Sequence, residues 1–76
     1  MKNTYQTKDM YIASYLSLFE KLVNVIKNND VFWFVFSNQE KCQRRVLKYW
    51  NGEATVTVRD YVSAIKNIKS RIFFNN

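Results

Sequence analysis

The hydrophobic positions of the chain follow two periods, and the most apolar stretch, residues 31–37, shows the shorter one. Its sequence, VFWFVFS, opens with six β-branched or aromatic residues, which is typical of a buried strand and too short for a stable helix. Side chains alternate along a strand, so one face carries Phe32, Phe34 and Phe36 and the other Val31, Trp33 and Val35. Both faces are apolar, and both need a covering partner.

A second apolar run, residues 21–26, precedes this strand across the tight turn 27–30. Asparagine tolerates the positive φ of short hairpin turns, so Asn28 and Asn29 are predicted as the two turn residues. The better core face then combines the three phenylalanines with Val23 and Val25, and the other face combines Trp33 with Leu22, Asn24 and Ile26.

Helical spacing of apolar residues predicts three helices. The first runs from an N-cap at Thr7 to about Phe19, with a wide apolar arc and Ser14 and Ser17 on its polar side. Ser37 and Glu40 form a capping box for the second, which ends near Trp50 before Asn51 and Gly52. Thr57 caps the third, which runs to about Phe73 with a core stripe of Val58, Tyr61, Val62, Ile65, Ile68 and Ile72.

The order of these elements predicts an α+β fold: a helix, an antiparallel β-hairpin and two helices packed on a small sheet. Residues 1–6 are predicted to be extended, with a short edge strand at 4–6. The chain has no proline and one glycine, so residues 1–76 are interpreted as a single domain without a linker. The matching apolar stripes predict that Phe34 and Phe36 are buried with Ile65 and Ile68.

The side chains argue against catalysis. The chain lacks histidine, and it shows neither a glycine-rich phosphate loop nor a nucleophile and base at a recognisable spacing. Cys42 lies on the apolar side of its helix, which favours a small buried hydrophobic residue over a reactive one. We therefore expect neither an enzyme nor a bound cofactor or metal. The single cysteine suits a reducing cytoplasm, and no apolar stretch indicates a signal peptide or a membrane span.

The net charge of +6 favours a polyanionic partner. Four basic residues at the spacing i, i+3, i+4, i+7 occupy one side of the second helix, roughly opposite Cys42, Val46, Tyr49 and Trp50: they are Lys41, Arg44, Arg45 and Lys48. The stripe is a candidate for phosphate contacts, and a purely solubilising face is the alternative. As a solvated stripe, it is expected to contribute little to stability.

Two weaker candidate sites accompany the stripe. Arg59 and Lys66, with two serines, form a basic edge on the last helix. Trp33 has three interpretations: a core residue under the first helix, an exposed stacking ledge bordered by Lys21 and Lys27, or the contact of a homodimer formed through the hairpin.

The chain resembles a known family on four segments: Thr7-Lys8-Asp9 with Ala13 and Leu16; Phe34-Val35-Phe36; residues 49–54, YWNGEA; and Arg59-Asp60-Tyr61 with Ala64, Ile68, Lys69 and Ile72. These segments are similar to a family of small bacterial, archaeal and phage proteins known as a domain of unknown function. The resemblance implies no activity and favours a phage or mobile-element origin.

Two functional hypotheses follow. The first is a nucleic-acid-binding module, with the Lys41–Lys48 stripe on phosphates and Trp33 on the bases of a single strand. The second is a phage or mobile-element accessory protein in the cytoplasm of a bacterial host. In that case it inhibits a host defence protein through an acidic or nucleic-acid-associated surface on that partner. A membrane-binding role is disfavoured because the basic helix belongs to a core.

Overall fold

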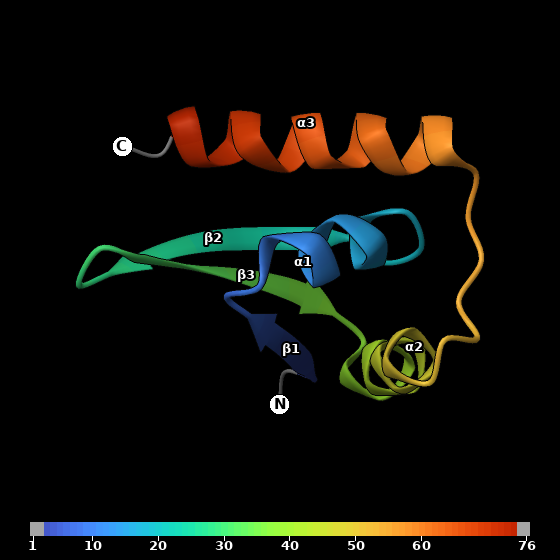
Figure 1. Ribbon diagram of the computed structural model, residues 1–76. Coiled ribbons are helices and arrows are strands. Elements are labelled where there is room, and N and C mark those ends of the chain that lie inside the picture. The colour runs from blue at the N-terminus through green and yellow to red at the C-terminus, as the bar shows by residue number, and fades with distance from the viewer. Residues whose placement is uncertain (1–2, 75–76) are drawn as a thin grey trace.

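The computed structural model describes residues 3–74, and over this range the chain forms three strands and three helices (Figure 1). In chain order the elements are β1 (Thr4–Thr7), α1 (Met10–Ser17), β2 (Leu22–Asn28), β3 (Val31–Ser37), α2 (Gln39–Trp50) and α3 (Val58–Phe74). The strands form one antiparallel sheet in the order β1-β3-β2. The predicted α+β class and the N-terminal edge strand are confirmed, while residues 1–2 of the predicted extended segment lie outside the described range.

The hairpin turns one residue later than predicted. Asn29 and Asp30 are the turn residues, with φ values of 53° and 67°, so β2 extends to Asn28. Moving a two-residue turn by one position changes every pairing by two residues, so Val25 pairs with Phe34 and not with Phe32. Because the side-chain period of a strand is also two, the predicted faces survive this shift.

A β-bulge corrects the predicted faces at the start of β2. The register shifts between Leu22 and Asn24, so that Leu22 pairs with Phe36. Leu22 therefore packs against the core, and Val23 is exposed. The bulge reverses the two positions because the extra residue changes which side chain points inward.

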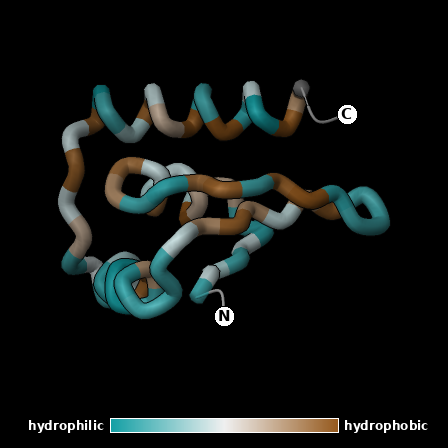
Figure 2. The backbone as a smooth tube through the Cα atoms, turned by 180° about the vertical axis from the view of Figure 1, so that it is seen from behind, coloured by the Kyte–Doolittle hydropathy of each residue, from teal (hydrophilic) through white to brown (hydrophobic). Residues whose placement is uncertain are grey.

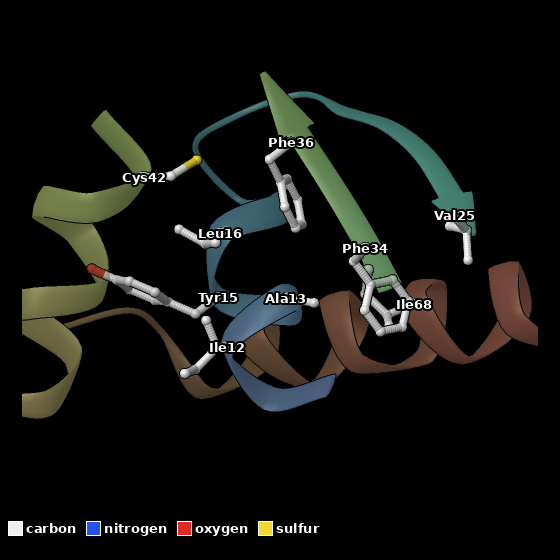
Figure 3. Packing of buried hydrophobic residues seen from close by; sticks show 9 residues of the cluster. All are labelled: Ile12, Ala13, Tyr15, Leu16, Val25, Phe34, Phe36, Cys42 and Ile68. Carbon is white, nitrogen blue, oxygen red and sulfur yellow. The ribbon is translucent and has the colours of Figure 1, made fainter. Parts of the chain in front are cut away.

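The core lies between the phenylalanine face of the sheet and the helices (Figure 3). Phe34 and Phe36 are fully buried with Leu16 of α1, Cys42 of α2 and Ile68 of α3. The predicted burial of Phe34, Phe36 and Ile68 is confirmed. Ile65 is only partly buried and is absent from this cluster, and Ala64 is the buried residue beside it.

The inward-facing line of α3 consists of Tyr61, Ala64, Ile68 and Ile72. The prediction that Val58 and Val62 belong to the core stripe is wrong, since both are exposed. Val58 is the first residue of the helix, three residues before Tyr61, and Val62 lies about 100° around the helix from Tyr61.

The helix starts partly differ from the predicted ones. Asp9 caps α1 by accepting hydrogen bonds from the Tyr11 and Ile12 amides, and Thr7 instead accepts one from the Asp9 amide. Asn38, in the left-handed region, replaces Ser37 as the cap of α2 because Ser37 still pairs in β3. The predicted cap of α3 is confirmed, with Thr57 Oγ1 3.1 Å from the Asp60 amide.

Helix α1 is shorter and differently oriented than predicted. It ends at Ser17, which leaves Leu18 and Phe19 exposed in the following turn. Ser14, predicted on the polar side, is fully buried and donates a hydrogen bond to the Met10 carbonyl at 2.8 Å. This bond satisfies the hydroxyl inside the core.

Candidate nucleic-acid interface

The basic stripe of α2 forms a concave surface. Its four side chains line one shallow depression of about 250 Å³: Lys41, Arg44, Arg45 and Lys48. They converge because positions i, i+3, i+4 and i+7 share one side of an α-helix. The buried side of the same helix faces away, with Cys42 in the core and Val46 and Tyr49 packed against it.

Arg45 is tied into the structure. Its guanidinium carbon lies 3.8 Å from the centroid of the Phe19 ring, and its Nε lies 3.6 Å from Glu20 Oε2. The Glu20 side chain is only 11% exposed, so this charge would be poorly solvated without the arginine. Arg45 therefore connects α2 to the turn that follows α1, and the alternative of a purely solubilising face does not hold at this residue.

Arg44 makes a weaker contact. Its Nη1 lies 3.5 Å from Glu40 Oε2, one helical turn earlier, and both side chains are largely exposed. Exposed ion pairs of this kind contribute about 0–1 kcal/mol, so a phosphate could replace the carboxylate at little expense in stability.

Lys41 and Lys48 are the available cations of the depression. Within residues 3–74, no carboxylate lies within ion-pair distance of either lysine. The four cations of the stripe and the two carboxylates that approach them leave a local charge of +2. The depression is thus a surface suited to anions.

The second basic edge lies apart from the depression. Arg59 and Lys66 are exposed on α3, and Ser63 and Ser70 follow the same side of this helix. Helix α2 is seen end-on in Figure 1, whereas α3 runs across the opposite side of the molecule. The structure therefore presents two separate basic surfaces.

The predicted basic border of Trp33 does not form. Lys27 pairs with Phe32 and its ammonium lies 5.7 Å from that ring, on the sheet face opposite Trp33. Lys21 precedes β2 at the far end of the hairpin from the turn, where its carbonyl accepts a hydrogen bond from the Ser37 amide. The first helix does not cover Trp33 either, because α1 packs on the phenylalanine face.

Trp50 is an exposed aromatic residue that the sequence reasoning assigned to the apolar side of α2. Its side chain is 66% exposed, with its ring 5.3 Å from that of Tyr49. A signal was present in the sequence, because Gln39 and Gln43 stand 11 and 7 residues before Trp50 and share its side of the helix. Leu47, also exposed, lies next to this line.

Cys42 is a buried thiol whose hydrogen bond to the Ser37 carbonyl spans 3.5 Å. Burial, and secondarily the charge of Glu20, raise its pKa from 9.0 to about 11. We therefore expect the native protein to resist a thiol-specific reagent at neutral pH and to react fully once unfolded in urea. Rapid native labelling at the rate of the unfolded chain would contradict this burial.

The same pKa shift predicts a loss of stability at alkaline pH. The unfolded thiol ionises first, near pH 9.0, while the folded thiol stays protonated to about pH 11. The contribution of Cys42 is therefore complete below pH 9.0 and is lost as the pH rises towards 11. Burial also raises the pKa of Tyr5 and Tyr61, which act in the same direction.

The fold and the depression together define a class: a small α+β protein with a basic concave surface on one helix. The chain belongs to the DUF5659 family, a domain of unknown function, whose family model matches residues 2–74. The resemblance inferred from the sequence is thereby confirmed. No curated protein matches the chain. No solved structure matches it either. Of the helices in the described range, none is long and apolar enough to cross a membrane.

Proposed function

We propose that this protein binds nucleic acid through the depression on α2, as a binding protein and not an enzyme. The observation that carries the proposal is the arrangement of Lys41 and Lys48, two cations without a nearby described carboxylate, in one depression with two arginines. Phosphate groups are the anions that repeat at regular spacing along a nucleic acid, and lysine and arginine contacts to them supply sequence-independent affinity.

Each residue of the depression has a distinct expected part. Lys41 and Lys48 contact phosphates directly, as flexible point charges. Arg44 releases the Glu40 carboxylate and contacts a phosphate oxygen instead, since its ion pair with Glu40 is exposed and weak. Arg45 stays paired to Glu20 and holds the helix in place, so it contributes positive potential more than a contact.

The test is the salt dependence of oligonucleotide binding by the Lys41→Gln/Lys48→Gln double variant. Loss of both contacts should flatten the slope of log affinity against log salt by about 1.8 on duplex DNA and about 1.4 on a single strand. The weakening should be the same for unrelated sequences. Fluorescence anisotropy of labelled oligonucleotides at several salt concentrations measures both slopes and compares single strands with duplexes.

Lys8→Gln/Lys69→Gln is the matched control. It also removes two positive charges, but from exposed positions that do not line the depression. An unchanged slope in this control, beside a flattened one in the first variant, supports the depression as the interface. Equal slopes for the parent and the Lys41→Gln/Lys48→Gln variant would remove the basis of the proposal.

The basic edge on α3 gives a separate prediction. If Arg59 and Lys66 also meet phosphates, Arg59→Gln/Lys66→Gln should flatten the salt slope by a further amount of about 1.4–1.8 and add to the effect of the α2 variant. Because both side chains are exposed, the melting temperature should stay the same. An unchanged slope would confine nucleic acid to the depression on α2.

A second candidate function is binding to a host protein. Exposed apolar side chains on α2 and at the start of α3 favour it, since Leu47, Trp50 and Val58 are all largely accessible. In this proposal a phage or mobile-element accessory protein acts in the bacterial cytoplasm. The apolar residues contact a defence protein, and the basic depression meets its acidic or nucleic-acid-associated surface.

Affinity capture from a bacterial lysate, with and without nuclease treatment, distinguishes the two candidates. A nucleic-acid-binding protein loses its captured material after nuclease, whereas a protein inhibitor retains one stoichiometric protein partner. The inhibitor also predicts that the purified chain binds no oligonucleotide. A Leu47→Ser variant should then lose the partner, because it removes the exposed apolar contact without changing the charge beside the depression.

A further inference from the structure

One face of the sheet carries no charge. The strand pairings place nine residues on it: Thr4 and Gln6 of β1, Val31, Trp33, Val35 and Ser37 of β3, and Asn24, Ile26 and Asn28 of β2. None of the nine is ionisable, although the whole chain contains 12 basic and 6 acidic residues. The centre of the face is apolar, and neutral polar side chains surround it.

Most of this face lies outside the hydrophobic core, although Val35 in the central strand is buried, at 7% exposure. Among the described residues, Trp33 and Val35 neither belong to the core cluster nor pack against it. Figure 2, which shows the molecule from behind, has β2 and β3 running in front of α1, with α2 at the end of the strands. The Cα trace is only 18 Å thick along its shortest axis, which suits two packed layers, since layers stack about 10 Å apart. Within residues 3–74, the helices therefore cover one side of the sheet only.

The edge of the sheet formed by β2 is poorly suited to pairing. β2 is an outer strand, and its Val25 amide is already occupied by the Asn24 side chain, Oδ1 lying 2.9 Å from the nitrogen. A bulge at its start and Lys27 near its end further disfavour the addition of a strand. On the β2 side of the sheet, association is thus favoured at the face and not at the edge.

We propose that two copies of this chain associate through the uncharged sheet face, with Trp33 and Ile26 at the centre of the contact. Two copies, each with a net charge of +6, repel one another when their basic surfaces meet. The uncharged sheet face lets the copies approach without opposing like charges. A nucleic acid or an acidic protein, in contrast, gains nothing from a surface without cations.

The size of the face sets the strength of the contact. Three strands about 4.8 Å apart and up to seven residues long, at about 3.4 Å per residue, give a face of about 300 Å². A standard interface buries about 800 Å² per partner, so a weak dimer is expected, with dissociation in the micromolar to millimolar range. The dimer should therefore depend strongly on protein concentration.

The test is sedimentation velocity on the full chain without nucleic acid, from about 1 µM to about 1 mM. The parent should shift from monomer to dimer mass with increasing concentration. Added salt should leave the dimer intact or strengthen it, because salt screens the repulsion between the two copies. Loss of the dimer at high salt would instead indicate association through charge pairs.

Ile26→Glu is the decisive variant. Ile26 is 41% exposed on this face, so the Ile26→Glu variant should still fold. In a dimer, the two glutamates would place two like charges in the contact. Val62→Glu is the matched control, at 43% exposure on α3 and with the same change in net charge. We expect Ile26→Glu to remain monomeric at every concentration and Val62→Glu to dimerise like the parent.

Trp33 provides a second measurement. In a Trp50→Phe background it is the only tryptophan, so its emission should shift to the red on dilution, over the range where the dimer mass is lost. A parent that is monomeric at the highest concentration overturns the proposal. So does a dimer that persists in Ile26→Glu, or one that Val62→Glu disrupts equally.

Discussion

Replacing Phe34 by alanine should destabilise the fold by about 3–5 kcal/mol, a large part of the total stability of a domain of this size. Phe34 is 1% exposed, pairs with Val25 and Thr7 on neighbouring strands, and belongs to the cluster formed with α1 and Ile68. The truncated side chain would leave a cavity between the sheet, α1 and α3, and these elements cannot all move inward to fill it. Urea denaturation followed by far-ultraviolet circular dichroism measures the change.

Val62→Ala is the control for this experiment, because the same kind of truncation at an exposed helical position should change stability by less than about 0.5 kcal/mol. An unaltered urea midpoint for Phe34→Ala would show that Phe34 does not occupy the centre of the core. The Ile68→Ala variant should behave like Phe34→Ala, since the two residues share the cluster.

Replacing Arg45 by glutamine should destabilise the protein by about 1–3 kcal/mol, unlike substitution of the lysines beside it. The change removes the stacking on Phe19 and leaves the nearly buried Glu20 carboxylate without its cation. Thermal and urea denaturation at neutral pH measure the loss. Lys41→Gln, which removes a charge without a described carboxylate partner, serves as the control and should leave stability unchanged.

A Glu20→Gln/Arg45→Gln double variant separates the ion pair from the stacking. If the unpaired carboxylate is the main cost, the double variant should recover part of the stability that Arg45→Gln loses. An Arg45→Gln variant as stable as the parent would mean that the stripe is a solvated surface throughout, the alternative that the sequence left open.

Turn chemistry and strand period account for the success of the predicted hairpin. The asparagine-rich turn and the run at 31–37 located two strands, and the one-residue error in the turn left the faces correct. The error arose because Asn28, Asn29 and Asp30 all tolerate positive φ, so local preference could not choose between the two turns. Cross-strand packing chose the turn that places Val25 opposite Phe34.

The candidate site was predicted in position but not in detail. Helical spacing alone grouped the four cations of α2, and they line one depression. The contacts that Arg45 makes with Phe19 and Glu20 could not be predicted, because these two residues lie 25 or more positions earlier in the chain. The exposure of Trp50 and Val58 depends likewise on where α2 ends and where α3 begins relative to the core.

By itself the sequence determined the α+β class, the three helices, the hairpin and the grouping of positive charge, because these follow from periodicity and spacing between near neighbours. The tertiary structure decided that Leu22 and not Val23 packs against the core, which cation gained a carboxylate, and that no helix of the described range covers the face bearing Trp33. Those outcomes depend on contacts between residues far apart in the chain. Several arrangements satisfy the same local preferences, and in the observed one Phe34 and Phe36 are fully buried.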